Sequence, residues 1–172
     1  MPIPPLCFVP IGGVGFSQLR TITTGMLWWK IIVPGIIDAV RALPGVKIFE
    51  NSGWAEHMGG GIWEFINANP DSLIYLCGHS LGVDTAIHTA AAATGRVAGM
   101  ALISSVWNYK AQPNCPTLVF KPTSSCFPQA EVGGIDATVI PDTDHNTITH
   151  NPRVITAIVS DVIKRRDLRI VY

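Results

Sequence analysis

The stretch that most constrains the fold is residues 71–94, where an apolar run leads into a serine flanked by two glycines. Residues 73–77 read Leu-Ile-Tyr-Leu-Cys, which is typical of a short strand buried on both faces of a parallel sheet. Gly-His-Ser-Leu-Gly follows at 78–82, and then an Ala-rich segment with helical propensity. Glycines have no Cβ, so the strand and the helix can approach closely while Ser80 is held in a strained conformation. The sequence therefore predicts a tight strand–turn–helix that lifts Ser80 above the carboxyl edge of the sheet.

This Gly-x-Ser-x-Gly spacing resembles the nucleophile elbow of the α/β-hydrolase family, and the residues Gly-His-Ser-Leu-Gly look most like those of lipases and esterases. The resemblance implies that Ser80 is a nucleophile and that the backbone N–H of Leu81 contributes to an oxyanion hole. The alternative is a purely structural turn in which Ser80 only caps the helix. His79 is expected to pack beneath the turn rather than to act in catalysis.

Length and composition narrow the class of protein. A chain of 172 residues is expected to form one domain, residues 1–172. Hydrophobic residues make up 48% of it, charged residues make up only 14%, and the net charge is zero. This balance gives no electrostatic basis for binding nucleic acid or an anionic membrane. There is no signal-peptide pattern and no run of about 18 apolar residues, so we expect a soluble, cytoplasmic protein without a transmembrane segment.

Strand-like and helix-like segments alternate along the chain, which favours a parallel α/β sheet. The expected strands are residues 6–9, 46–49, 73–77, 97–104, 117–120 and 135–140. The expected helices are residues 21–43 with a break at Pro34-Gly35, residues 62–66, the segment after the elbow, and residues 151–164. We therefore predict a minimal α/β-hydrolase fold, with a mostly parallel five- or six-stranded sheet and helices on both faces. The resemblance to small lidless lipases and cutinases covers nearly the whole chain.

The Gly-rich loop that follows the first strand, residues 10–16, permits two interpretations. A dinucleotide site would need a third glycine at the right spacing and an acidic residue about 20 positions later, and neither is present. The hydrolase resemblance places the second oxyanion-hole donor in this loop. On that basis the N–H of Ile11 or Gly12 is the expected donor.

The candidate general base follows the last strand, where residues 141–145 read Pro-Asp-Thr-Asp-His. The resemblance implies that His145 is the catalytic histidine, because a serine hydroxyl needs a base of near-neutral pKa to remove its proton. With the nearby acids and His150 the segment could suggest a metal cluster, but such loop acids are usually solvated. We expect no metal and no organic cofactor. His57 is expected to be a solvated loop residue.

The third member of a triad is missing from its usual place. The family normally has an Asp or Glu in the loop after the penultimate strand, and here Ser125 occupies that turn. Asp142 is ranked narrowly above Glu131 as the acid, whereas Asp144 should point away from the imidazole. A Ser–His dyad oriented by water or by a hydroxyl, with Ser124 or Ser125 as candidate, remains open.

The function expected from these residues is that of a serine hydrolase cleaving carboxylic esters through an acyl-enzyme, acting on a small-molecule or lipid-like ester. The alternatives are an acyltransferase or a thioesterase using the same site, and a non-catalytic binding or structural protein that keeps the fold. Trp28 and Trp29 are expected in the core rather than in an acyl site. The cysteines are expected to be free thiols, since Cys115 and Cys126 would bridge only in an oxidising compartment.

Overall fold

The strands of the protein form one parallel sheet in the order β2-β1-β3-β4-β5-β6. The structure is a computed structural model that describes residues 4–12, 34–49, 60–110, 112–124 and 131–168. The strands are β1 (Leu6–Ile11), β2 (Val46–Ile48), β3 (Ile74–His79), β4 (Val97–Ile103), β5 (Thr117–Pro122) and β6 (Thr138–Ile140). This arrangement confirms the expected minimal α/β-hydrolase fold.

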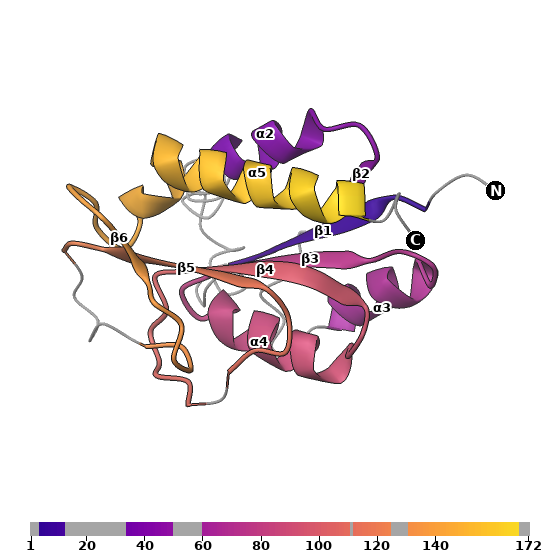
Figure 1. Ribbon diagram of the computed structural model, residues 1–172, viewed down its shortest axis with the longest axis horizontal. Helices are drawn as coiled ribbons and strands as arrows, with labels where there is room; N and C mark the ends of the chain where they lie inside the picture. The colour runs from indigo at the N-terminus through magenta and orange to yellow at the C-terminus, as the bar shows by residue number, and fades with distance from the viewer. Residues whose placement is uncertain (1–3, 13–33, 50–59, 111, 125–130, 169–172) are drawn as a thin grey trace, which may run out of the picture.

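Helices cover both faces of the sheet (Figure 1). Helices α2 (Pro34–Arg41) and α5 (Pro152–Asp167) lie on one face, and α3 (Gly60–Ala68) and α4 (Gly82–Ala92) lie on the other. Strand β1 pairs with both β2 and β3, so the winding direction of the chain reverses there. Ligands of open α/β sheets bind outside the carboxyl ends of the strands at such a reversal. Ser80 immediately follows the carboxyl end of β3.

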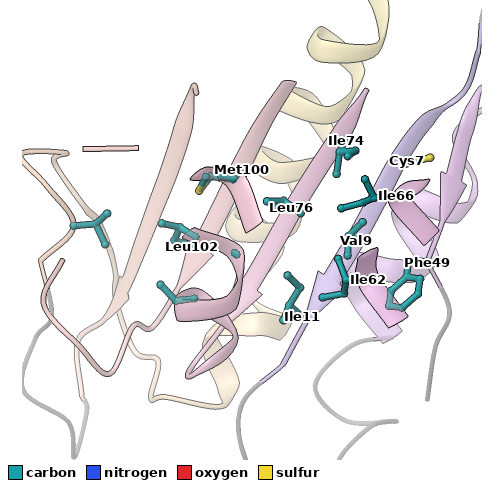
Figure 2. Close-up of a cluster of buried hydrophobic side chains, with 14 of the residues drawn as sticks. Cys7, Val9, Ile11, Phe49, Ile62, Ile66, Ile74, Leu76, Met100 and Leu102 are labelled. Carbon is teal, nitrogen blue, oxygen red and sulfur yellow. The ribbon is translucent and has the colours of Figure 1, made fainter. Parts of the chain in front are cut away.

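Two hydrophobic clusters fill the space between the sheet and its helices. Side chains alternate along β3, so that Ile74 and Leu76 belong to one cluster while Tyr75 and Cys77 belong to the other. Figure 2 shows the first cluster, in which Leu76 lies beside side chains of the neighbouring strands. With both faces buried, β3 is a rigid support for the residues at its carboxyl end.

A buried polar contact fixes α5 to the middle of the sheet. The Tyr75 hydroxyl donates to the Asp161 carboxylate over 2.9 Å, and Arg165 forms an ion pair of 2.9 Å with the same carboxylate. A Cβ on Gly99 would lie 3.1 Å from the Tyr75 ring and 3.2 Å from Arg165 Nε, so glycine leaves room for this pair. Helix α5 follows the segment that contains His145, so the contact also anchors that segment at one end.

Most departures from the expected elements are small. Strand β6 begins at Thr138 rather than Ile135, because Ile135 pairs with Val132 in an isolated bridge. Its edge position agrees with the expectation, since Val139 is 54% exposed. Helix α2 covers Pro34–Arg41, and the part of the expected helix that precedes Pro34 lies outside the described residues.

Several expectations concern residues outside the described part of the chain: Trp28, Trp29, His57, Ser125 and Cys126. Among the described residues, Cys77 and Cys115 are free thiols. No helix in the described ranges is long and apolar enough to cross a bilayer.

Candidate active site

The turn between β3 and α4 has the strained geometry that the glycine spacing predicts. Ser80 adopts a left-handed conformation with φ 59°, and its N–H donates to the carbonyl of Ile103 over 3.0 Å. A Cβ on Gly78 would lie 2.7 Å from the Gly82 carbonyl oxygen and 2.9 Å from Val83 Cα. Strand and helix could not pack this closely with any larger residue at position 78.

Gly82 serves a different contact, between the elbow and the end of β1. A Cβ at this position would lie 2.6 Å from the carbonyl oxygen of Gly12 and closer still to that of Ile11. A Cβ this close to carbonyl groups could be accommodated only if the backbone moved, because backbone atoms cannot change rotamer as a side chain can. Gly82 therefore holds the end of β1 against the first turn of α4.

The Ser80 hydroxyl faces the imidazole of His145. The distance from Ser80 Oγ to His145 Nε2 is 2.9 Å, within the range in which a base removes a hydroxyl proton. Ser80 lies at the end of β3, whereas His145 lies in the turn between β6 and the 3₁₀ helix η2 (Thr147–His150). The fold thus brings together Ser80 and His145, the two residues from separate segments that the sequence predicts to be catalytic.

The turn that carries His145 is held by its own hydrogen bonds. The Asp144 carboxylate accepts from the N–H groups of Asn146 and Thr147, each over 2.8 Å, and the Asp144 N–H donates to the Thr147 hydroxyl over 2.9 Å. These bonds lower the pKa of Asp144 below its usual value, the bond from Thr147 contributing most. The carboxylate therefore caps the turn that carries His145.

The environment of His145 favours its neutral form. Partial burial lowers the pKa of His145 below its ordinary value, and the nearby Asp144 carboxylate opposes this shift. A neutral imidazole with an unprotonated Nε2 can accept the Ser80 proton. His145 therefore has the protonation state of a general base at neutral pH.

His79 lies directly beneath His145. The two rings are 4.9 Å apart, and the Nε2–H of His79 donates to the backbone carbonyl of His145 over 2.7 Å. Burial lowers the pKa of His79 to about 4, so the ring is neutral at physiological pH. A neutral imidazole that donates from Nε2 leaves Nδ1 unprotonated, and among the described residues this buried nitrogen has no hydrogen-bond partner. His79 thus packs beneath the turn, as expected, and also holds the backbone of the base.

The other nitrogen of His145 contacts a residue that the sequence did not indicate. Ser104 Oγ lies 2.6 Å from His145 Nδ1. Ser104 directly follows β4, is only 3% exposed, and has a left-handed backbone with φ 49°. Its N–H donates to the Phe120 carbonyl over 2.9 Å. The sequence shows only a serine at a strand end, because the pairing of β4 with β3 is what places it next to Ser80.

The two candidate acids both lie on the surface. Asp142 is exposed and forms the turn after β6 with φ 55°, a left-handed conformation that Asp tolerates well. Glu131 is also exposed, and its N–H donates to the Asn108 side chain over 2.8 Å. Ser124, an alternative hydroxyl, is exposed as well. Ser104 is the residue that contacts Nδ1 of His145, and the ranking of Asp142 over Glu131 stays a prediction.

The candidate oxyanion-hole residues lie beside the elbow. Leu81 is the N-cap of α4, Ile11 is the last residue of β1, and Gly12 follows it. The close approach of Gly82 to the Ile11 and Gly12 carbonyls places the end of β1 next to the elbow. The roles of their N–H groups remain predictions. Within the described ranges, no group of three or more His, Cys, Asp or Glu side chains is arranged to hold a metal ion.

Comparison with known families identifies the chain. The family described as serine aminopeptidase S33, a hydrolase family, matches residues 61–171, which include Ser80, Ser104 and His145. The chain belongs to this α/β-hydrolase family. A search of curated proteins finds no significant match to this hydrolase.

Solved structures of other hydrolases share the fold. One is Est1E from Butyrivibrio proteoclasticus with bound ferulic acid, at 12% identity and a TM-score of 0.62, covering 95% of this chain and 90% of Est1E. A CIB-like hydrolase from Thermoplasma acidophilum has 16% identity and a TM-score of 0.61, with coverage of 98% and 88%. A lidless serine hydrolase from Xanthomonas campestris has 16% identity and a TM-score of 0.56, with coverage of 96% and 82%. At these identities the likeness is one of fold.

Proposed function

We propose that this hydrolase cleaves carboxylic esters through an acyl-enzyme formed on Ser80, with His145 as general base. The observation that carries the proposal is the 2.9 Å contact between Ser80 Oγ and His145 Nε2, made by a serine in a strained elbow. Backbone strain that persists beside a polar contact of this kind is characteristic of functional sites. A serine that only capped the helix would need neither the left-handed backbone nor the imidazole.

The proposed reaction begins when Ser80 Oγ attacks the ester carbonyl carbon while its proton passes to His145 Nε2. The negative charge that develops on the carbonyl oxygen is stabilised by backbone N–H groups, for which Leu81 and either Ile11 or Gly12 are the candidates. The ester C–O bond then breaks, and His145 returns the proton to the departing alcohol. Water, deprotonated by His145, releases the acid and restores Ser80.

The substrate class proposed is a small-molecule or lipid-like ester, because the chain is rich in apolar residues and low in charge. The same groups could transfer the acyl chain to another acceptor, cleave a thioester, or hydrolyse a peptide bond, the reaction that the description of the family as serine aminopeptidases suggests. A domain spanning residues 1–172 and a cytoplasmic location stay part of the proposal. None of these steps needs a cofactor.

A substrate panel tests the proposal. We expect the wild type to hydrolyse p-nitrophenyl esters of short or medium acyl chains faster than the matched thioesters and aminoacyl p-nitroanilides. Ser80→Ala should abolish this turnover, and Ser124→Ala, which removes an exposed hydroxyl, should leave it unchanged. Faster cleavage of the anilides would show that the protein is a peptidase rather than an esterase. A folded wild type with no turnover of any of these substrates would favour a non-catalytic binding protein.

A further inference from the structure

We propose that Ser104 is the positioning residue of the catalytic base, so that the site operates as a Ser80–His145–Ser104 relay. In this relay the Ser104 hydroxyl accepts a hydrogen bond from Nδ1–H of His145 and orients Nε2 toward Ser80. The inference rests on the proposed function for the Ser80–His145 pair, and extends it to the group that supports the base.

The position of Ser104 is fixed by the sheet. Ser104 N–H is bonded to β5 through Phe120, and Ser80 N–H is bonded to the last residue of β4, Ile103. Both serines are therefore held by backbone hydrogen bonds to the next strand of the sheet, on opposite sides of the imidazole of His145. Both also have a left-handed backbone, with φ 59° and 49°. Two strained serines that contact the two nitrogens of one histidine indicate selection for function at each position.

A hydroxyl supports an imidazole differently from a carboxylate. A carboxylate only accepts hydrogen bonds, so it selects the tautomer with the proton on Nδ1. A hydroxyl both accepts and donates, so it also permits the tautomer with the proton on Nε2, which cannot take the Ser80 proton. A hydroxyl is also neutral and provides no full charge to stabilise the imidazolium. Ser104 therefore gives His145 its orientation but only part of the electrostatic help of an acid.

This difference defines the substitutions that test Ser104. Asp and Asn tolerate the left-handed conformation at this position, whereas a β-branched residue would not. Ser104→Asp should fix the productive tautomer, and its charge should raise the pKa of His145 by about one unit or more. Ser104→Ala should lower kcat/KM by about ten- to a hundredfold, the range expected for losing one hydrogen bond to a charged group.

The matched control is the neighbouring hydroxyl. Ser105 lies one residue later, is half-buried, and its hydroxyl donates to the Trp107 carbonyl over 2.9 Å. Ser105→Ala should therefore leave both kcat/KM and its pH dependence unchanged. Should Ser104→Ala fail to fold, Ser104→Asn retains an acceptor oxygen compatible with the backbone and should keep the pH profile of the wild type.

The deciding experiment is a ¹⁵N NMR titration of the His145 ring in the intact wild type, Ser104→Ala, Ser104→Asp and Ser105→Ala. We expect the midpoint for His145 to move to lower pH in Ser104→Ala, to higher pH in Ser104→Asp, and to stay in place in Ser105→Ala. Identical titrations in all four proteins would overturn the inference. Because the titration needs no substrate, an inactive wild type with these shifts would refute the proposed function and leave the Ser104–His145 coupling intact.

Discussion

Ser80 and His145 face each other across 2.9 Å, yet they are held by different kinds of structure. Around Ser80 the constraints are steric, since Gly78 leaves no room for a Cβ beside the first turn of α4 and Gly82 leaves none beside the end of β1. Around His145 the constraints are hydrogen bonds, some within its own turn through Asp144 and others that join it to two distant residues, Ser104 after β4 and His79 in β3. The comparison teaches that a short motif can encode the nucleophile, whereas the support of the base depends on the assembled sheet.

Substitutions around Ser80 and around His145 should therefore have different effects. A larger side chain in the elbow pushes against carbonyl groups that cannot move alone, so it should reduce the stability of the whole fold. Loss of a hydrogen bond at His145 leaves the backbone intact, so it should reduce the rate or shift its pH dependence. The following substitutions test this contrast, from the largest expected effect to the smallest.

Removing the base should have the largest effect. His145→Ala should lower kcat for a p-nitrophenyl ester by at least about 10⁴-fold, as loss of the base does in other serine hydrolases, without unfolding the protein. In the wild type, the rate should rise with pH through a single step below the ordinary imidazole value of about 6.5, because burial lowers the pKa of His145. His150→Ala is the control and should retain activity. If His150→Ala were inactive and His145→Ala active, the base would be misassigned.

A methyl group in the elbow should chiefly cost stability. Gly82→Ala places a Cβ against the Ile11 and Gly12 carbonyls, so we expect a loss of about 3 kcal/mol or more in the free energy of unfolding. Gly134→Ala is the matched control, because its Cβ would meet no atom within 4 Å and only the left-handed backbone, φ 71°, opposes it. The control should lose about 1–2 kcal/mol. Urea denaturation measures both, and equal losses would remove the steric account of the elbow.

The same contrast explains how much the sequence revealed. The apolar run before Gly78 and the spacing of the two glycines identified the elbow, because both features lie within a few residues of Ser80. His145 was predicted from its place after the last strand and from the order Ser before His. Ser104 was missed because a serine at the end of a strand has no local signature, and only the pairing of β4 with β3 and β5 shows where it lies. Asp142 was favoured for its place after the last strand, and that ranking stays a prediction.

The buried histidine beneath the base should make stability depend on pH. Burial lowers the pKa of His79 from 6.5 to about 4. Between pH 6.5 and pH 4, the histidine is therefore protonated in the unfolded chain but neutral in the folded protein. The free energy of unfolding should therefore be highest above pH 6.5. It should decrease as the pH falls toward 4, and His79 should account for roughly 3 kcal/mol of this decrease. His79→Gln keeps a donor for the His145 carbonyl and does not titrate. Urea denaturation across this range should show a weaker pH dependence in the variant, and an unchanged dependence would exclude His79 as its source.

The exposed acids should have the smallest effect. Asp142→Asn and Glu131→Gln should each change kcat/KM by less than about twofold, because both side chains are exposed and Ser104 faces Nδ1. A triad acid would behave otherwise, since its amide replacement costs about 10⁴ in turnover. Steady-state kinetics on the two variants decides between these outcomes. A loss of that size in Asp142→Asn would restore Asp142 as the acid.

The central claim is that His145 activates Ser80, and labelling with a fluorophosphonate probe tests it most directly. Mass spectrometry of the labelled wild type should find the phosphonate on Ser80, formed at a rate that rises with pH as His145 loses its proton. Ser80→Ala should not be labelled at this site, and His145→Ala should be labelled far more slowly. A folded wild type that carries no adduct, or an adduct on another serine, would contradict the account.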